Sequence, residues 1–450
     1  RYHHRTGDSN ALNMVDLTLT RMASGGIYDQ LGGGFHRYAT DVRWLVPHFE
    51  KMLYDNALLA RVYLHAWQVT GRPLYRRIVE ETLDYVIREM TAEYPGRPDL
   101  GACDKTGGFY SAQDADSEGE EGKFFVWTPD QVKSVLGEEE GKVFCGFFDV
   151  TPGGNFEGKS ILNVKLDLGT AAAAAQMQED HYRTIVDQGK NKLFQTRKAR
   201  VKPDRDEKVL TAWNGLMVAA FAEASYVLDR EDYRQVAECN AHFVLTELRQ
   251  NRRLLRSWKL EAQTGEGNAR FNAYLEDYAF YADGLLALYQ ATFDPSWFAE
   301  ARALADILLS HFSDPNGGFF DTSHDHEQLV TRPKTLQDNA IPSGNAMAAD
   351  VLLRLAAYTG EDAYRRPVEE MLAAMIPMMR QYPGGFSHWL SVLAFYLAPP
   401  YEIALIGDLA LDNTRIMLDA VSGDYRPHQV VALAAPGDET AASIIPLLAN

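Results

Sequence analysis

The tripeptide Gly33-Gly34-Phe35 decides the fold, because it recurs between helical segments along the chain. The copies are 74 residues apart within the first pair and 67 residues apart within the last pair, and they are Gly33-Gly34-Phe35, Gly107-Gly108-Phe109, Gly317-Gly318-Phe319 and Gly384-Gly385-Phe386. Two helices of average length with their loops fill an interval of this size. Helix pairs repeated in this way stack around an axis. We therefore predict a mainly α protein built as an (α/α) toroid over residues 1–398.

Helical periodicity and terminal signals place the helices. Pro47 suits the first position of a helix that ends before Gly71, and Thr128 with Gln131 forms a capping box. The expected helices span 10–23, 47–69, 74–90, 173–192, 207–228, 232–249, 274–292, 296–312, 345–358 and 361–380. After Pro399-Pro400 the pattern changes to strand (401–407), helix (411–421) and strand (429–435). We expect a small βαβ-like extension over residues 399–450, packed on the toroid.

Composition excludes several classes of function. The 450 residues exceed what one small core can use, and 44 basic against 62 acidic residues leave a net charge of −18. Such a chain is repelled by phosphate backbones and anionic membranes, so we expect no nucleic-acid partner and no membrane association. No apolar run approaches the roughly 20 residues of a membrane span.

Cysteine usage and motif searches argue against a cofactor. Cys103, Cys145 and Cys239 are far apart without a CxxC pair, which favours free thiols in a cytoplasmic protein and neither a disulfide nor zinc. The segment from Asp114 imitates a calcium loop, but Phe125 occupies the position that requires Glu. No phosphate-binding or nucleophile-elbow motif occurs. We predict neither metal nor cofactor.

Several polar residues fall on apolar helical faces. Asp55, Asn214 and Asp277 each have apolar residues three or four positions away. Burial of an unpaired polar group is costly, so we expect all three to be inaccessible and hydrogen-bonded, or to line a wet central cavity. The alternative is that they tie loops to helix ends.

A denser set of titratable groups lies between residues 32 and 52. It contains His36, Arg37, Tyr38, His48 and Glu50. His48 and Glu50 fall in the first turn of the helix expected from Pro47, and histidine is the natural proton carrier near neutral pH. Loop tethering is the competing interpretation.

Long segments of the chain resemble one family. They are GGIYDQLGGGFHRYATD from Gly25, VPHFEKMLYDNA from Val46, GGFYSAQDADSEGEEGKFFVWT from Gly107, DEKVLTAWNGLM from Asp206, LEDYAF from Leu275 and LQDNAIPSGNAMAA from Leu336. The set is similar to the spermatogenesis-associated protein 20-like family of thioredoxin-domain proteins. The resemblance implies an N-terminal thioredoxin-like domain, which this chain lacks, followed by an (α/α)6, six-hairpin glycosidase-like toroid related to N-acylglucosamine 2-epimerase.

This resemblance leads to a carbohydrate-active toroid as the favoured hypothesis, with a small carbohydrate as partner. It would work as an epimerase or isomerase, with His48 and His388 exchanging a proton next to a carbonyl. Glu50, Arg37 and Arg332 would fix and polarise the sugar, and Trp127, Trp213 and Tyr278 would stack on it. The further expected substrate contacts are His36, Tyr38, Asp55, Asn214, Ser343 and Asn345.

Two alternatives remain open. A glycoside hydrolase would need paired carboxylates about 5–5.5 Å or about 6.5–9.5 Å apart, for which Asp116 and Asp277 are the candidates. The other alternative is a non-catalytic ligand-binding or scaffold module that works with the thioredoxin-like domain.

Overall fold

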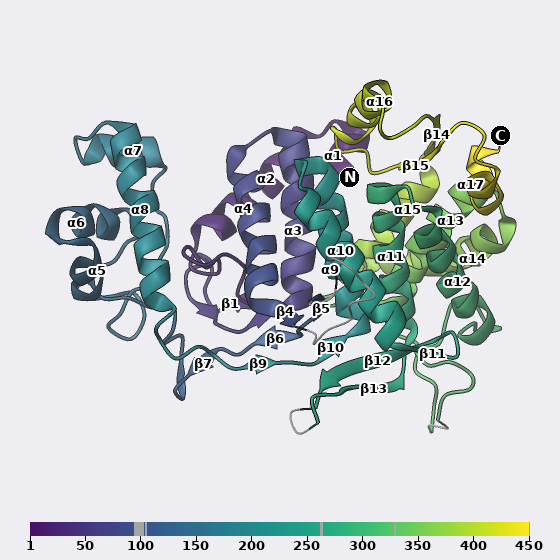
Figure 1. Ribbon diagram of the computed structural model, residues 1–450, viewed down its shortest axis with the longest axis horizontal. Helices are drawn as coiled ribbons and strands as arrows, with labels where there is room; N and C mark the ends of the chain where they lie inside the picture. Colours follow the sequence, from purple (N-terminus) through teal and green to yellow (C-terminus); the bar gives the residue numbers. More distant parts are fainter. Residues whose placement is uncertain (94–102, 104–105, 262–263, 328–329, 450) are drawn as a thin grey trace.

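The computed structural model describes residues 1–93, 103, 106–261, 264–327 and 330–449. These residues form seventeen α-helices, and most of their strands are only two to six residues long. The prediction of a mainly α toroid with few strands is confirmed (Figure 1).

Five helices form the inner layer within the described residues. They pack in ring order as α3 (Leu53–Thr70), α9 (Thr211–Leu228), α11 (Leu275–Thr292), α13 (Gly344–Thr359) and α15 (Ser387–Leu397). Helices α9, α11 and α13 are buried on nearly every side, as expected for helices that are apolar all round. Helices α9 and α11 touch at Gly215 and Gly284, where a Cβ on Gly215 would lie 2.5 Å from the backbone of Phe280.

An outer helix follows most inner helices along the chain. The outer helices are α4 (Pro73–Tyr85), α10 (Glu231–Glu247), α12 (Pro295–His311) and α14 (Asp362–Gln381). Before them come α1 (Tyr2–Thr6) and α2 (Ser9–Ser24), and the Tyr75 hydroxyl of α4 donates to Asp16 of α2 at 2.7 Å. The buried faces of outer helices such as α4 and α14 are narrower stripes than those of the inner helices, which is the pattern of surface helices.

Asparagines clamp three of the four Gly-Gly-Phe loops to inner helices. Asn56 of α3 accepts from the Phe35 amide at 2.7 Å and donates to the Phe35 carbonyl at 3.1 Å. Asn214 and Asn345 hold Phe109 and Phe319 in the same way. Gly33 and Gly34 have φ values of 75° and 79°, which side-chain-bearing residues rarely adopt. The repeat therefore brings loops together at the N-terminal ends of the inner helices; this end of the ring is called the rim below.

Short strands surround the rim. They are β1 (Tyr38–Ala39), β2 (Pro47–His48), β3 (Lys51–Met52), β4 (Thr91–Glu93), β5 (Thr106–Phe109), β6 (Ala112–Gln113), β7 (Asp116–Ser117), β8 (Glu120–Glu121), β9 (Arg205–Asp206), β10 (Val209–Leu210), β11 (Arg249–Gln250), β12 (Arg253–Leu260) and β13 (Gly267–Asn272). In Figure 1 many of them lie along the lower edge of the molecule, beneath the inner helices.

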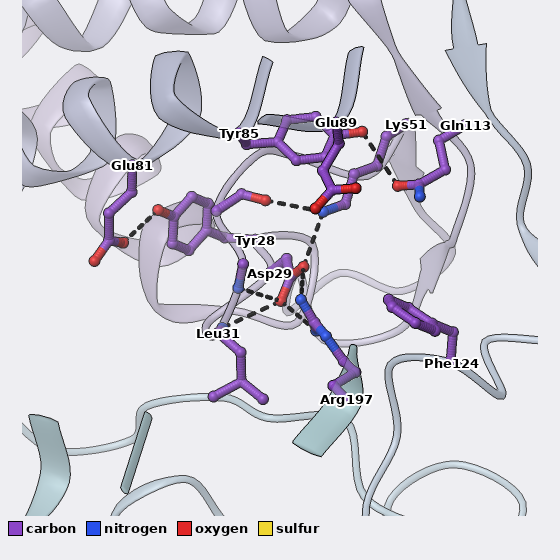
Figure 2. Close-up of polar contacts among 12 residues, drawn as sticks. Tyr28, Asp29, Leu31, Lys51, Glu81, Tyr85, Glu89, Gln113, Phe124 and Arg197 are labelled. Atoms are coloured by element: carbon purple, nitrogen blue, oxygen red, sulfur yellow. Dashed lines mark hydrogen bonds and ion pairs between the residues drawn. The ribbon is translucent and has the colours of Figure 1, made fainter. Parts of the chain in front are cut away.

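A helical insertion between β8 and β9 was not foreseen. It contains α5 (Pro129–Leu136), α6 (Glu138–Phe147), α7 (Leu168–Ala174) and α8 (Glu179–Arg197), and it stands to the side of the toroid with its own apolar core. Figure 2 shows the buried ionic contact that attaches it: Asp29 accepts from Arg197 of α8 at 2.8 Å and from Lys51 at 2.9 Å. Burial lowers the pKa of Lys51 to about 8, although Asp29 opposes that shift.

The C-terminal βαβ pattern is present. Strand β14 (Tyr401–Ile406) pairs in parallel with β15 (Gln429–Ala434), and α16 (Asp412–Ser422) connects them. Helix α17 (Glu439–Ile444) follows. In Figure 1 this extension lies at the upper edge, beyond the C-terminal ends of the inner helices.

Four expectations were wrong in detail. The helix expected over 207–228 begins at Thr211, because residues 209–210 pair with β12 as strand β10. Helix α3 begins at Leu53 and not at Pro47, because residues 47–48 pair with β1 as a strand. The single helix expected over 173–192 is two helices, α7 and α8. Cys103 and Cys239 form a disulfide across 136 residues, so only Cys145 is a free thiol. The two cysteines are far apart in the sequence, and only the fold brings residue 103 beside α10. The spacing of the cysteines therefore could not predict the disulfide.

Candidate functional site

A group of polar and aromatic side chains meets at the rim near the start of α3. We call it the rim cluster: Arg37, Tyr38, His48, Glu50, Tyr54, Asp55, Glu121 and Trp213. It draws on β1, β2 and β8 as well as the first turns of α3 and α9. All of these except Tyr54 and Glu121 were candidates from the sequence.

His48 lies between two carboxylates. Its Nδ1 is 2.7 Å from Oε1 of Glu121, and its Nε2 is 3.6 Å from Oε2 of Glu50. Glu50 also accepts from Arg37 at 2.9 Å, and the Tyr38 ring lies 5.2 Å from the His48 ring. The His48 side chain is 28% exposed. The histidine is therefore positioned by side chains and still reaches solvent.

Asp55 is the carboxylate with a strongly raised pKa in this cluster. Burial raises its pKa to about 7, and the charge of Glu50 adds to the shift while Arg37 opposes it. Its Oδ2 is buried and has no hydrogen-bond partner among the residues that the structure describes. Asp55 was expected to be mostly inaccessible and hydrogen-bonded; it is half-buried, and the expected hydrogen bond is not made by its Oδ2 to any described residue. Asn214 and Asp277 are buried and hydrogen-bonded, as expected. A carboxyl of this pKa exchanges protons near neutral pH.

Aromatic rings lie beside this carboxyl. Tyr54 precedes it on α3 and meets Trp213 of α9 edge-on, with ring centroids 4.8 Å apart. Trp213 is partly exposed. Rings of this kind offer apolar faces to a bound ligand next to the titratable groups.

A second polar group occupies the ring axis nearer the C-terminal ends of the inner helices. The cavity there has a volume of about 130 Å³ and is roofed by residues 422–429 of the extension. We call it the axial cavity. Tyr425 of that roof lies 4.7 Å from the His65 ring, and Gln68 donates to the Ser422 carbonyl at 2.9 Å.

A chain of ions crosses this cavity from α9 to α13. Arg61 contacts Glu223 at 2.5 Å and Asp283 at 2.8 Å. Arg354 contacts Asp283 at 2.6 Å and Asp350 at 3.4 Å. Burial would raise the pKa of Glu223 and Asp350, but the guanidiniums of Arg61 and Arg354 outweigh it and hold both well below their ordinary values. Glu223 and Asp350 are therefore ionised and paired.

Four residues of this ion chain were not candidates from the sequence: Arg61, Glu223, Asp350 and Arg354. A signal was available: Glu223 is the only charged residue of α9, and Asp350 and Arg354 are the only ones of α13. Lone charges in otherwise apolar helices need partners, and an inner ring lets them find each other across the axis.

His388 belongs to the axial group and not to the rim cluster. It is the second residue of α15, and its Nε2 lies 3.2 Å from Oδ2 of Asp350. No contact between His388 and His48 occurs within the described part of the chain. The two histidines therefore belong to separate sets of contacts.

Other candidate site residues from the sequence form hydrogen bonds within the protein itself. His36 is buried against the Phe49 carbonyl, and burial with the nearby Lys51 charge lowers its pKa to about 3. Asn214 and Asn345 have no exposed surface because they clamp loops. Ser343 caps α13, and Arg332 donates to the Thr322 carbonyl. These side chains are engaged by the protein itself.

The expected stacking residues beyond Trp213 are core. Trp127 is 1% exposed inside the insertion, under the guanidinium of Arg200. Tyr278 is fully buried, and its hydroxyl accepts from the Leu254 amide at 3.0 Å. Neither ring can meet a ligand without unfolding its surroundings.

The proposed carboxylate pair for glycoside hydrolysis is not supported. Asp277 is 1% exposed and accepts from the amides of Ala212 and Tyr274 at the start of α11. Asp116 is an exposed residue of the β7–β8 hairpin. Among the described residues no group of three or more His, Cys, Asp or Glu could hold a metal ion.

Fold and site together define a class: a toroid of helical hairpins with an acid–base cluster at its rim and a closed ionic network on its axis. No family model matches the chain. It is 35% identical to human spermatogenesis-associated protein 20 over 96% of its own length, and 28% identical to the uncharacterized protein B0495.5 of Caenorhabditis elegans over 89%. The chain belongs to the spermatogenesis-associated protein 20 family. It spans 58% of the human protein and 56% of the nematode one.

Solved structures of similar shape are distant. Cellobiose 2-epimerase from Spirochaeta thermophila is 12% identical with a TM-score of 0.47, covering 82% of this chain and 70% of its own. A D-mannose isomerase is 10% identical with a TM-score of 0.37, covering 81% and 86%. Neither likeness assigns chemistry to this chain. Among the described residues no helix combines the length and apolar character that a membrane crossing requires.

Proposed function

We propose that the rim cluster is the active site of a carbohydrate epimerase or isomerase. The observation that carries the proposal is the Asp55 carboxyl, with a pKa of about 7, an unpartnered buried oxygen and an adjacent guanidinium. General acid–base catalysis works best when the catalytic pKa lies near the operating pH. Asp55 takes the role that His388 was expected to share with His48.

The proposed reaction is a proton transfer next to a carbonyl. Ionised Asp55 removes the proton from the carbon beside the carbonyl of an open-chain sugar, and the electron pair moves into an enediolate. Arg37 stabilises the oxygen that gains charge. His48, held by Glu121 and Glu50, donates a proton to the carbon from the other face of the sugar. In an isomerisation it donates instead to the neighbouring carbon, while the hydroxyl proton passes to the former carbonyl oxygen. Solvent then returns both side chains to their starting protonation states. Tyr38 and Trp213 supply apolar faces for the sugar carbons.

Deuterium exchange tests this proposal directly. The protein is incubated in D2O with D-glucose, D-mannose and cellobiose, and exchange at the carbon beside the carbonyl is followed by proton NMR. We expect exchange with at least one sugar, and a loss of about 10²–10⁴-fold in Asp55→Asn. Asp187→Asn is the matched control, because this exposed carboxylate lies on α8 of the insertion. No exchange with any sugar, or equal rates in both variants, would overturn the proposal.

A further inference from the structure

A groove of about 350 Å³ lies where the N-terminal loops of the toroid meet the insertion. Its lining includes the three cations Arg21, Arg43 and Lys165 and no carboxylate. This composition contrasts with a chain whose net charge is −18. A concave surface lined by one sign of charge attracts ligands of the opposite sign.

The positive charges of Arg21 and Arg43 are only weakly neutralised by carboxylates of the protein. Arg21 is exposed and has no ion-pair partner among the described residues. Arg43 is 76% exposed, with its nearest carboxylate, Asp41, at 4.0 Å. The same Asp41 already accepts from the backbone amides of Arg43, Leu45 and Val46. Lys165 does pair with Asp149 at 2.7 Å. Two guanidiniums are thus available for an anion.

Trp44 gives the groove a fixed aromatic side. It is partly exposed, and the Ile27 amide donates to its carbonyl at 3.1 Å. A Cβ on Gly25 would lie 2.2 Å from that carbonyl oxygen, so the loop is pressed against α2. The Trp44 φ of 62° is unusual for a bulky residue. The ring is therefore presented by a constrained backbone.

The groove and the rim cluster share one hairpin. Tyr38 of β1 pairs with His48 of β2, and the connection between these strands carries Arg43 and Trp44. Trp44 and His48 are four positions apart in the sequence, so their Cα atoms lie at most about 14 Å apart. Tyr38 is 51% exposed along this route. A ligand longer than one sugar could extend from the rim cluster to the groove.

From this juxtaposition we propose that the groove binds the acidic units of an anionic oligosaccharide whose terminal sugar occupies the rim cluster. The inference rests on the proposed function and adds the substrate class. Guanidiniums bind carboxylates through paired, charge-assisted hydrogen bonds, and Trp44 offers a face to a sugar ring.

Direct binding tests the substrate class. Calorimetry compares a galacturonic acid tetramer with an uncharged cello-oligosaccharide of the same length. We expect the acidic tetramer to bind at least about tenfold more tightly, with an affinity that falls as salt rises. Arg21→Ala and Arg43→Ala should each weaken it about tenfold. Arg366→Ala is the control, since this arginine is 80% exposed on α14 and remote from the groove in sequence.

The outcomes separate this inference from the proposed function. Binding of the acidic tetramer that persists in Asp55→Asn supports the groove even if no sugar undergoes exchange. Equal affinity for both oligosaccharides, or equal weakening by Arg366→Ala, overturns the groove while leaving exchange untouched. Equally tight binding of a poly-glutamate peptide of the same charge overturns the saccharide class. Melting curves of the variants show that they remain folded.

Discussion

The rim cluster and the axial cavity use the same kinds of side chain and reach opposite states. At the rim, Asp55 is largely buried with an unpartnered oxygen, and its pKa rises to about 7. On the axis, Asp350 is buried and Glu223 is half-buried, yet the pKa of each lies below its ordinary value. Burial acts on the carboxyls in both places, so the number of cationic donors around each carboxyl decides whether its pKa is raised or lowered. Arg37 is partly engaged by Glu50, whereas Arg61 and Arg354 point at the axial carboxylates.

This difference in pKa means that the carboxyls of the axial cavity and the rim cluster behave differently at neutral pH. A carboxylate held by guanidiniums keeps its charge at neutral pH and cannot carry protons. The axial network ties inner helices together and closes one end of the ring. The rim keeps a group that titrates near neutral pH beside partly exposed rings. The same ring of helices thus carries paired, ionised carboxylates on its axis and a carboxyl with a raised pKa at its rim.

Removing the central axial carboxylate should have the largest effect. In Asp283→Ala both Arg61 and Arg354 lose a partner inside a buried network, and Asp283 is only 2% exposed. Breaking a buried ion pair typically costs about 3–5 kcal/mol. We expect the free energy of unfolding to fall by that amount in urea titrations, or expression to fail. A second variant, Asp283→Asn, retains the shape and should lose less. A change below about 1 kcal/mol in both would show that the network does not hold the ring together.

Glu223→Gln should have the next largest effect and should act through pH. The folded-state pKa of Glu223 is lowered, so its contribution to stability is present above the unfolded-state value and is lost as pH falls through the folded-state value. We expect a loss of about 2–3 kcal/mol at pH 7, because Arg61 keeps Asp283 as a partner. The difference from wild type should shrink in acid. Unfolding titrations at pH 7 and pH 3 measure it, and a difference that grows in acid would contradict the pairing.

Asp55→Asn should change the pH dependence of stability in the opposite direction from Glu223→Gln. Its folded-state pKa is raised to about 7, so the folded protein binds the extra proton and the wild type loses stability as pH rises from about 4 to 7. The amide removes this loss, and the variant should be more stable than wild type at pH 8 by about 1–2 kcal/mol. Unfolding titrations of wild type and variant from pH 4 to 8 show whether the variant becomes the more stable protein as pH rises. A variant that is less stable at pH 8 would mean that Asp55 has a partner in solution.

The sequence revealed the architecture better than the site. Repeated Gly-Gly-Phe loops gave the helix pairs, because glycine geometry and helical periodicity are local properties. The start of α3 was misplaced, since Pro47 is equally compatible with a helix and with a strand at a sheet edge. Asn214 and Asn345 looked like ligand contacts but hold loops, and periodicity cannot tell these two roles apart. The pairing of Glu121 with His48 crosses 73 residues and depends on where the β7–β8 hairpin places Glu121.

His48→Ala should have the smallest effect on stability and a large one on function. Its ion pairs with Glu121 and Glu50 are partly exposed, and such pairs contribute about 0–1 kcal/mol. Under the proposed function, the same variant should slow deuterium exchange about 10²–10⁴-fold. His388→Ala provides the matched control, because that histidine contacts Asp350 on the axis. It should affect the melting temperature more than the exchange rate. A reversed pattern, with exchange lost only in His388→Ala, would move proton transfer from the rim to the axis and invert the division between the two ends.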